Sequence, residues 1–180
     1  EQWMHALQMF REMQNHTVEP DVISRNSLMS ALLKGSLWER AVEMLSDVIS
    51  IDAQPTLISY NTAINAFAIA GQWERALRML GKMREQDVEP NVISFNAAIN
   101  SCGKCGYWER ALEILSDMVE QDVLPNAITY NSMMSAYGKS ERWEMVLWTL
   151  AEMREKDVLP TLISYSAVIS ACEKGEQWER

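Results

Sequence analysis

Apolar side chains recur along this chain at the spacing of a helix face, in short segments separated by turn residues. In segment 57–69 the apolar positions are Tyr60, Ala63, Ile64 and Phe67. Segment 72–86 follows the same rule with Trp73, Ala76, Leu77, Leu80 and Met83. Gly71 separates the segments, and Pro90 marks the end of the second because proline disfavours helical geometry in the residue before it. The pattern predicts two antiparallel helices joined by short turns.

This helix pair repeats along the whole sequence with a period of 35 residues. The period is kept by Pro20, Pro55, Pro90, Pro125 and Pro160, and by Trp3, Trp38, Trp73, Trp108, Trp143 and Trp178. No segment sustains the alternation of a strand. We therefore expect an all-α fold, an α-α superhelical solenoid of helix-turn-helix repeats, in which stacked neighbours cover the apolar stripe that one helix cannot bury alone.

We expect residues 1–180 to form one repeat array, truncated at both ends. It would contain a partial repeat at 1–21, complete repeats at 22–56, 57–91, 92–126 and 127–161, and a partial repeat at 162–180. First helices are expected near 22–34, 57–69, 92–104, 127–139 and 162–174. Second helices are expected near 2–16, 37–51, 72–86, 107–121 and 142–156.

The tryptophan and cysteine positions are interpreted as packing positions. Each Trp opens a second helix. Three residues later the chain has Ala6, Ala41, Ala76 and Ala111, with Val146 in the fourth complete repeat, and a large ring beside a small residue lets neighbouring helices approach closely. Cys102 and Cys105 have the C-x-x-C spacing of a metal or redox site. However, Cys102 and Cys172 share a column with Leu32, Phe67 and Tyr137, so we expect them to behave as small hydrophobic residues. We expect no metal and no cofactor.

A polar stripe recurs about 100° from the core stripe of the first helices. Its central column is Asn26, Asn61, Asn96 and Asn131, with Ser166 in the last copy. Three residues earlier stand Ile23, Ile58, Ile93, Ile128 and Ile163. Four residues after the central column are small polar residues, and four further on are Lys34, Lys104, Lys139 and Lys174. Asparagine is a weak helix former, so its recurrence in register indicates a specific role.

Two interpretations of these polar columns stay open at this point. The Asn column either faces solvent and meets a ligand or forms an internal amide ladder, and a ladder is compatible with ligand binding. The residue after each proline (Asp21, Thr56, Asn91, Asn126 and Thr161) is of a helix-capping type. The Ser or Thr three residues later is an alternative cap, which would free the residue after the proline for a ligand.

Charge is divided unequally between the two kinds of helix. The chain has a net charge of −9. The five first-helix segments hold five bases and one acid, a net +4, which leaves −13 for the rest. Local potential governs where a polyanion docks, so a chain that is acidic overall is still able to bind one on its first helices. The acidic second helices would form a convex face that suits basic protein partners.

Several function classes find no support in the sequence. No apolar run approaches the roughly 18 residues needed to cross a bilayer, and no secretory signal is visible. No nucleophile, base and carboxylate set and no phosphate-binding loop occurs, so we expect no intrinsic catalysis and no small-molecule substrate.

The columns resemble those of the pentatricopeptide-repeat family over essentially the whole chain. The clearest copy, at 92–126, reads VISFNAAINSCGKCGYWERALEILSDMVEQDVLPN. Its hydrophobic pair, Phe-Asn step, Lys at the end of the first helix, Ala-Leu in the second and closing Pro-Asn are similar to that family's 35-residue unit. The Trp that opens each second helix departs from the common consensus, at a structural column.

This resemblance implies a protein that binds single-stranded RNA with one base per repeat, read by two side chains. The implied reading pairs are Asn26 with Thr56, Asn61 with Asn91, Asn96 with Asn126, and Asn131 with Thr161, while Ser166 lacks a partner. The resemblance implies a lean toward pyrimidines, and Asn with Thr matches the family less well than Asn with Asn. The Ile column would sandwich the bases, and the Lys column would contact phosphates.

The resemblance also implies work on organellar transcripts, in RNA processing, stability, editing or translation, within the mitochondrion or chloroplast. The alternative is a helical scaffold that holds an extended peptide in the same groove.

Overall fold

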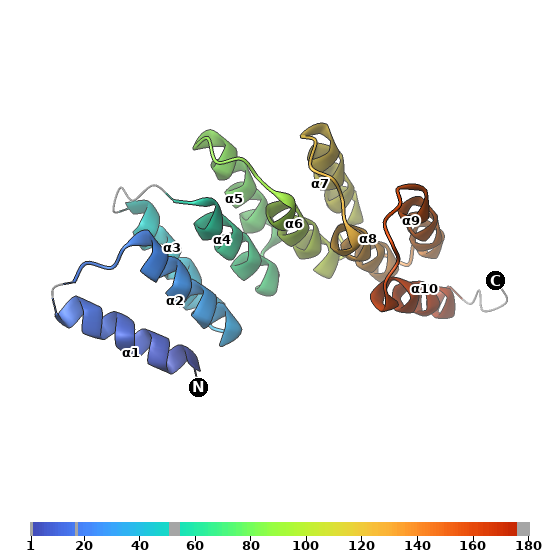
Figure 1. Cartoon of the computed structure of the whole chain (residues 1–180). Helices are drawn as coiled ribbons and strands as arrows, with labels where there is room; N and C mark the ends of the chain where they lie inside the picture. The colour runs from blue at the N-terminus through green and yellow to red at the C-terminus, as the bar shows by residue number, and fades with distance from the viewer. Residues whose placement is uncertain (1, 17, 51–54, 176–180) are drawn as a thin grey trace. The chain divides into compact units, whose positions relative to one another are not determined.

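The computed structural model describes residues 2–16, 18–50 and 55–175, which form ten α-helices and no strand (Figure 1). The first helices are α2 (Val22–Lys34), α4 (Leu57–Ile69), α6 (Val92–Lys104), α8 (Ala127–Lys139) and α10 (Leu162–Lys174). The second helices are α1 (Gln2–Asn15), α3 (Trp38–Ser50), α5 (Trp73–Glu85), α7 (Trp108–Glu120) and α9 (Trp143–Glu155). The predicted all-α repeat solenoid is confirmed. None of the described helices is long and apolar enough to span a membrane.

The limits of the first helices agree with the predicted ones, whereas the second helices were predicted slightly too long. α5, α7 and α9 each begin at the tryptophan, one residue later than predicted. The residues before these tryptophans make no side-chain cap bond and lie outside the helical region, so each helix begins one position later. Ile51, the predicted end of one second helix, and Trp178 lie outside the described residues.

The turns within and between repeats depend on left-handed backbone positions. The turn after a first helix has positive φ at Gly71 and Gly106, and also at Ser36 and Glu141 in the same column. The turn after a second helix has positive φ at Asp87, Asp122 and Asp157. Aspartate tolerates this conformation better than most residues because its short side chain bonds locally. These positions explain why the helix pairs reverse direction where they do.

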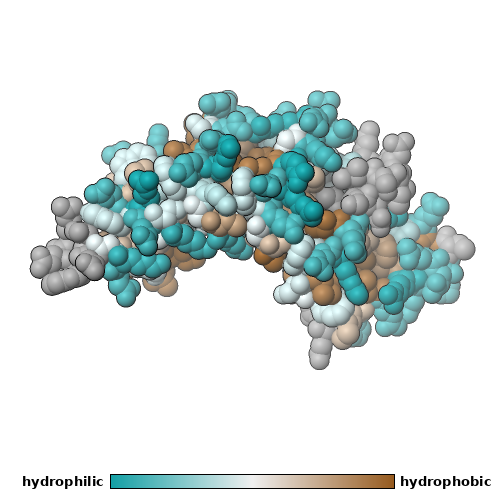
Figure 2. Space-filling model, turned by 180° about the vertical axis from the view of Figure 1, so that it is seen from behind, coloured by the Kyte–Doolittle hydropathy of each residue, from teal (hydrophilic) through white to brown (hydrophobic). Residues whose placement is uncertain are grey.

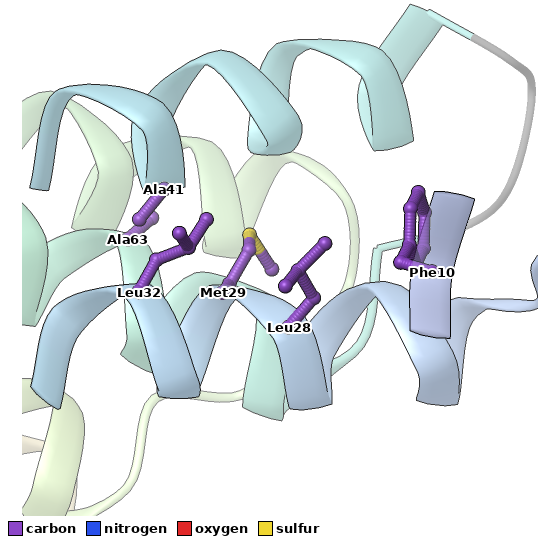
Figure 3. Packing of buried hydrophobic residues seen from close by; sticks show 6 residues of the cluster. All are labelled: Phe10, Leu28, Met29, Leu32, Ala41 and Ala63. Atoms are coloured by element: carbon purple, nitrogen blue, oxygen red, sulfur yellow. The ribbon is translucent and has the colours of Figure 1, made fainter. Parts of the chain in front are cut away.

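The chain divides into two compact units, Glu1–Glu89 and Pro90–Arg180. In the first, α2 contacts α1, α3 and α4, and α4 contacts α5. Its core is a cluster of side chains from α1 to α4, shown in Figure 3: Phe10, Leu28, Met29, Leu32, Ala41 and Ala63. All are at most 9% exposed, so each helix covers the apolar stripe of its neighbour, as the repeat pattern requires.

In the second unit, α8 lies between α6 and α10 and contacts both, so the first helices form a continuous row (Figure 1). α7 packs on α6 and α8, and α9 packs on α8 and α10. Phe95, Ile99, Met118 and Met153 are fully buried in this unit. The row of first helices brings equivalent positions of successive repeats next to one another.

The tryptophan and cysteine columns take part in packing. The ring centroids of Trp108 and Tyr137 lie 5.9 Å apart. The guanidinium carbon of Arg142 lies 5.1 Å from the centroid of the Trp108 ring. Cys102 is fully buried, and burial raises the pKa of its thiol to about 11. A thiol with that pKa is protonated at neutral pH and is a poor metal ligand or nucleophile. Among the described residues, no His, Cys, Asp and Glu side chains are grouped to hold a metal.

Candidate nucleic-acid interface

The residue after each proline caps the first helix that follows. Asp21, Thr56, Asn91, Asn126 and Thr161 all have extended backbone and accept a hydrogen bond from the backbone N–H three residues later. In the last four helices that later Ser or Thr also accepts from the backbone N–H of the cap, which makes a capping box. The question that the sequence left open is therefore answered: both columns cap, and the oxygen after the proline is already engaged.

The Asn column bonds to these caps across successive repeats. In the second unit, Nδ2 of Asn96 donates to Oδ1 of Asn126 at 3.2 Å. The hydroxyl of Thr129 donates to Oδ1 of Asn96 at 2.6 Å. Oδ1 of Asn126 also accepts from the backbone N–H groups of Ile128 and Thr129, at 3.0 and 3.1 Å. We call this set of three side chains, Asn96, Asn126 and Thr129, the closed rung.

The next repeat has a similar arrangement with a different cap. Nδ2 of Asn131 donates to the hydroxyl oxygen of Thr161 at 3.2 Å, and the hydroxyl of Ser164 donates to Oδ1 of Asn131 at 2.6 Å. Asn131 is half-buried and Thr161 is exposed. A hydroxyl both donates and accepts, so this set does not force one orientation of the Asn131 amide.

The first unit contains an incomplete version of the same set. Nδ2 of Asn26 donates to the hydroxyl oxygen of Thr56 at 3.2 Å. Oδ1 of Asn26 is buried and has no hydrogen-bond partner, because the hydroxyl of Ser59 bonds to Thr56 instead. We call Asn26, Thr56 and Ser59 the open rung.

The expectation that the Asn column faces solvent is wrong for Asn26 and Asn96, which are 7% and 8% exposed. They are covered because successive first helices pack side by side and bring each amide to the cap of the next helix. The alternative interpretation, an internal amide ladder, describes these positions. Since a primary amide has two donors and two acceptor lone pairs, one N–H of each carboxamide stays unengaged, together with one lone pair of the Asn96 oxygen and both of the Asn26 oxygen.

The other positions of the stripe lie at the surface. Exposures of the Ile column are 74% for Ile23, 63% for Ile58, 58% for Ile93, 61% for Ile128 and 66% for Ile163. Large aliphatic side chains at this exposure gain nothing from the core. Ile58, Ile128 and Ile163 each precede the Ser or Thr of a capping box, and therefore border the Asn–cap contacts of Asn26, Asn96 and Asn131. Asn61 is half-buried, and Ser166 is exposed.

Lys34, Lys104, Lys139 and Lys174 are exposed at the last residue of their first helices. Nζ of Lys139 donates to the backbone carbonyl oxygen of Lys104 at 2.6 Å, at the end of α6. A cation at this place is favoured by the unpaired carbonyls at a helix C-terminus. The Lys column therefore has a structural role at one position and still presents its charge to solvent.

Sequence reasoning missed the second role of Thr129 and Ser164. The sequence offered both as alternative helix caps, but their hydroxyls also bond the Asn of the preceding repeat. The signal in the sequence was a column of Ser or Thr that keeps a fixed 33-residue distance from the Asn column.

Family models match nearly the whole of the described chain. The PPR repeat family matches residues 90–137 and 125–174, the pentatricopeptide repeat domain matches 43–105, and the PPR repeat matches 23–52. The chain belongs to the pentatricopeptide-repeat family. No curated protein was found whose sequence matches that of this pentatricopeptide-repeat chain.

Solved pentatricopeptide-repeat proteins have the same fold. The chain is similar to PPR10 from maize, with a TM-score of 0.70 and 28% identity over 96% of this chain and 24% of that one. PPR10 in complex with an 18-nt psaJ RNA element gives a TM-score of 0.80 and 25% identity, over 91% of this chain and 24% of that one. The PPR domain of Arabidopsis thaliana protein-only RNase P 1 in complex with tRNA gives a TM-score of 0.78 and 17% identity, over 96% of this chain and 91% of that one. The present chain therefore spans about a quarter of the length of PPR10.

Proposed function

We propose that this pentatricopeptide-repeat chain binds single-stranded RNA selectively, with one base at each repeat, as part of organellar RNA processing, stability, editing or translation. The observation that carries the proposal is the exposed Ile column beside hydrogen-bonded Asn–cap pairs. An apolar side chain that contributes nothing to the core, repeated beside a polar pair, suits a ligand that is itself a repeat of flat apolar faces and polar edges.

The Ile column would hold the bases. Ile93 and Ile128 stand at equivalent positions of the adjacent helices α6 and α8, so a base placed at the closed rung would have one above it and one below. Apolar contact to a base face excludes water without selecting among bases. Stacking on aromatic side chains is worth about 1–3 kcal/mol per base in single-strand binders, and the isoleucines would supply apolar contact to the base faces without the aromatic ring.

The Asn and cap columns would read the base edge. In the closed rung, Oδ1 of Asn126 is occupied by two backbone N–H groups and by Asn96, so what Asn126 still offers is its amide N–H. An N–H donor suits a carbonyl acceptor such as O2, which both pyrimidines carry. This supports the pyrimidine preference that the family resemblance implies.

The exposed lysines would contact phosphates. Each phosphate contact releases counterions, so binding would weaken with salt at a slope of about −0.7 per contact on a logarithmic scale for single strands. Four lysines in this column therefore predict a shallow salt dependence, which matches the moderate positive charge of the first helices.

The resemblance to PPR10 supports the choice of RNA, since that protein was solved with an RNA element bound. A location in the mitochondrion or chloroplast is proposed on family resemblance, and an organelle import assay of the parent protein tests it. Basic protein partners on the acidic second helices remain a further prediction, and pull-down with a Lys-rich peptide tests them.

The sharpest test replaces exposed isoleucines by glutamate. Ile93→Glu with Ile128→Glu would place carboxylates in the first turns of α6 and α8, where negative charge is favourable for the helix. We expect the double variant to melt like the wild type and to lose at least about tenfold in affinity for a pyrimidine-rich oligonucleotide, a change of about 1.4 kcal/mol.

Val119→Glu with Trp148→Glu is the matched control. It adds the same charge on second helices at side chains that are each 55% exposed, close to the 58% and 61% of Ile93 and Ile128. RNA affinity is expected to stay near the wild-type value. Equal losses in both double variants, or wild-type binding that does not distinguish pyrimidine-rich from purine-rich RNA, would refute the proposed site.

A further inference from the structure

Thr129 is fully buried and lies where three polar groups of two repeats meet. Its hydroxyl oxygen accepts from the backbone N–H of Asn126 at 3.0 Å and lies 2.6 Å from Oδ1 of Asn96. The capping role uses the acceptor side of this hydroxyl. The contact with Asn96 uses its proton, so the two roles are chemically separate.

In the closed rung, each hydrogen bond has only one possible donor and one possible acceptor. The atom of Asn126 that meets the backbone N–H groups of Ile128 and Thr129 must be its oxygen, because an N–H cannot accept. The atom of Asn96 that meets this oxygen must then be Nδ2. That leaves Oδ1 of Asn96 facing Thr129, whose single proton goes to it at 2.6 Å in preference to Oδ1 of Asn126 at 3.2 Å.

We propose that the buried hydroxyl of Thr129 is a positioning group for base reading, which locks the Asn96 carboxamide in one orientation. It thereby sets which polar atoms of Asn96 a base meets. The inference rests on the proposed RNA function, and adds a residue outside the two reading columns. Without this hydroxyl, the oxygen of Asn96 loses its partner, and only the bond from Nδ2 to Oδ1 of Asn126 is left to hold the amide.

The first unit contains a natural comparison. Ser59 keeps the capping role, since its hydroxyl accepts from the backbone N–H of Thr56 at 3.1 Å, but it makes no bond to Asn26. Oδ1 of Asn26 is left without a partner. The capping box therefore forms without the contact to the Asn oxygen, so the two roles are separable, although Ser164 combines them in the set of Asn131 and Thr161.

The first experiment measures the orientation of Asn96 in the RNA-free 180-residue chain. Thr129→Val keeps the shape of the side chain and removes the hydroxyl, whereas Thr129→Ser restores it. We expect the side-chain amide resonances of Asn96 to shift and broaden in the valine variant and to return in the serine variant. Ser59→Ala is the matched control, and is expected to leave the side-chain resonances of Asn26 near their wild-type positions.

The second experiment measures base discrimination with pyrimidine oligonucleotides in which one position at a time is changed to a purine. In Thr129→Val we expect the penalty at one position to fall from about tenfold to less than about threefold, since one hydrogen bond contributes about 1 kcal/mol. Affinity for the all-pyrimidine strand is expected to change by less than about threefold. Should the valine variant not fold, Thr129→Ala serves the same purpose.

The outcomes separate the two ideas. Wild-type protein that shows no base preference overturns the proposed function. Full discrimination in Thr129→Val, or unchanged Asn96 resonances in that variant, overturns the positioning role alone. If Thr129→Val and Thr129→Ser both lose base discrimination, the positioning role is also overturned, because the change in packing would then be the cause.

Discussion

The open rung of the first unit and the closed rung of the second carry the same columns in different hydrogen-bonding states. Asn26 and Asn96 are 7% and 8% exposed, so both amides are removed from water to the same extent. In the closed rung both polar atoms of the amide are partnered, whereas Oδ1 of Asn26 has none. A buried acceptor without a partner costs about 1–3 kcal/mol, so the two repeats differ in both stability and order.

The difference teaches that the cap residue decides whether the orientation of the amide is forced, whereas the bond to the amide oxygen varies even between Thr-capped sets, since Ser164 bonds Asn131 and Ser59 does not bond Asn26. Oδ1 of Asn126 is forced to be an acceptor by two backbone N–H groups, so it selects Nδ2 of Asn96 as its partner, and the hydroxyl of Thr129 holds the oxygen of the same amide. A Thr cap such as Thr56 has a hydroxyl that both donates and accepts, and dictates nothing. We therefore expect repeats closed by Asn to discriminate bases more strictly than repeats closed by Thr.

The largest expected effect is that of removing the cap of the closed rung. Asn126→Ala takes away the N-cap of α8 and the partner of Asn96 together, so we expect a loss of about 2–3 kcal/mol in the free energy of unfolding. Thr56→Ala also removes a cap and the partner of Asn26, but it is expected to cost less, about 1 kcal/mol, because Thr56 caps one backbone N–H at 3.4 Å whereas Asn126 caps two at 3.0 and 3.1 Å. Urea denaturation followed by circular dichroism measures both. Equal costs would remove the contrast between the rungs.

Next comes the replacement of each amide by an apolar side chain of similar size. Asn96→Leu would leave the hydroxyl of Thr129 without its short bond and cost about 1–3 kcal/mol. Asn26→Leu removes the unpartnered oxygen, so we expect a stability within about 0.5 kcal/mol of the wild type, or above it. Thermal melting of the two variants compares them. A larger loss at Asn26 than at Asn96 would contradict the assignment of the open rung.

A smaller effect is expected at the turn that follows the first helix of each repeat. Ser36 has φ 61°, and Gly106 in the equivalent turn of the second unit has φ 78°. Left-handed geometry costs a residue with a Cβ about 1–2 kcal/mol, so Ser36→Gly is expected to stabilise the first unit by about 0.5–1 kcal/mol. Gly106→Ser is the reverse control and is expected to destabilise. Both are measured by the midpoint of urea unfolding.

The smallest effect concerns pH. Asp21 caps α2 with a carboxylate, and hydrogen bonds from the side chain and then the backbone N–H of Ser24 hold its pKa below the ordinary value. A lowered pKa in the folded state means that its stabilisation is present above the ordinary pKa of aspartate and is lost as pH falls through the folded value.

In the wild type, the hydrogen-exchange protection of the amides in the first turn of α2 should therefore fall at acidic pH. In Asp21→Asn this fall should be smaller. The first turn of α8, which has the neutral cap Asn126, should show no such dependence on pH. Amide hydrogen exchange at acidic and neutral pH measures this. A first turn of α2 that is equally protected at both pH values in the wild type would contradict the prediction.

Much of the fold followed from the periodic sequence. The limits of the first helices were predicted because each follows Pro and a capping residue, and these are local signals. Cys102 was assigned to the core because it shares a column with Leu32 and Phe67, and it is fully buried. The second helices were predicted too long because their tryptophans lack a preceding side-chain cap.

The roles of the Asn, Ile and Lys columns in RNA binding remain predictions. The sequence determined the repeat and its polar columns, since these follow from a 35-residue period, and it determined the helices, since their caps and apolar spacing are local signals. The tertiary structure alone decided that Asn26 and Asn96 are buried, and that Thr129 bonds Asn96 whereas Ser59 leaves Asn26 without a partner. Those contacts join residues 30 and 33 apart in the chain, and a few tenths of an ångström in the packing of adjacent first helices make or break them.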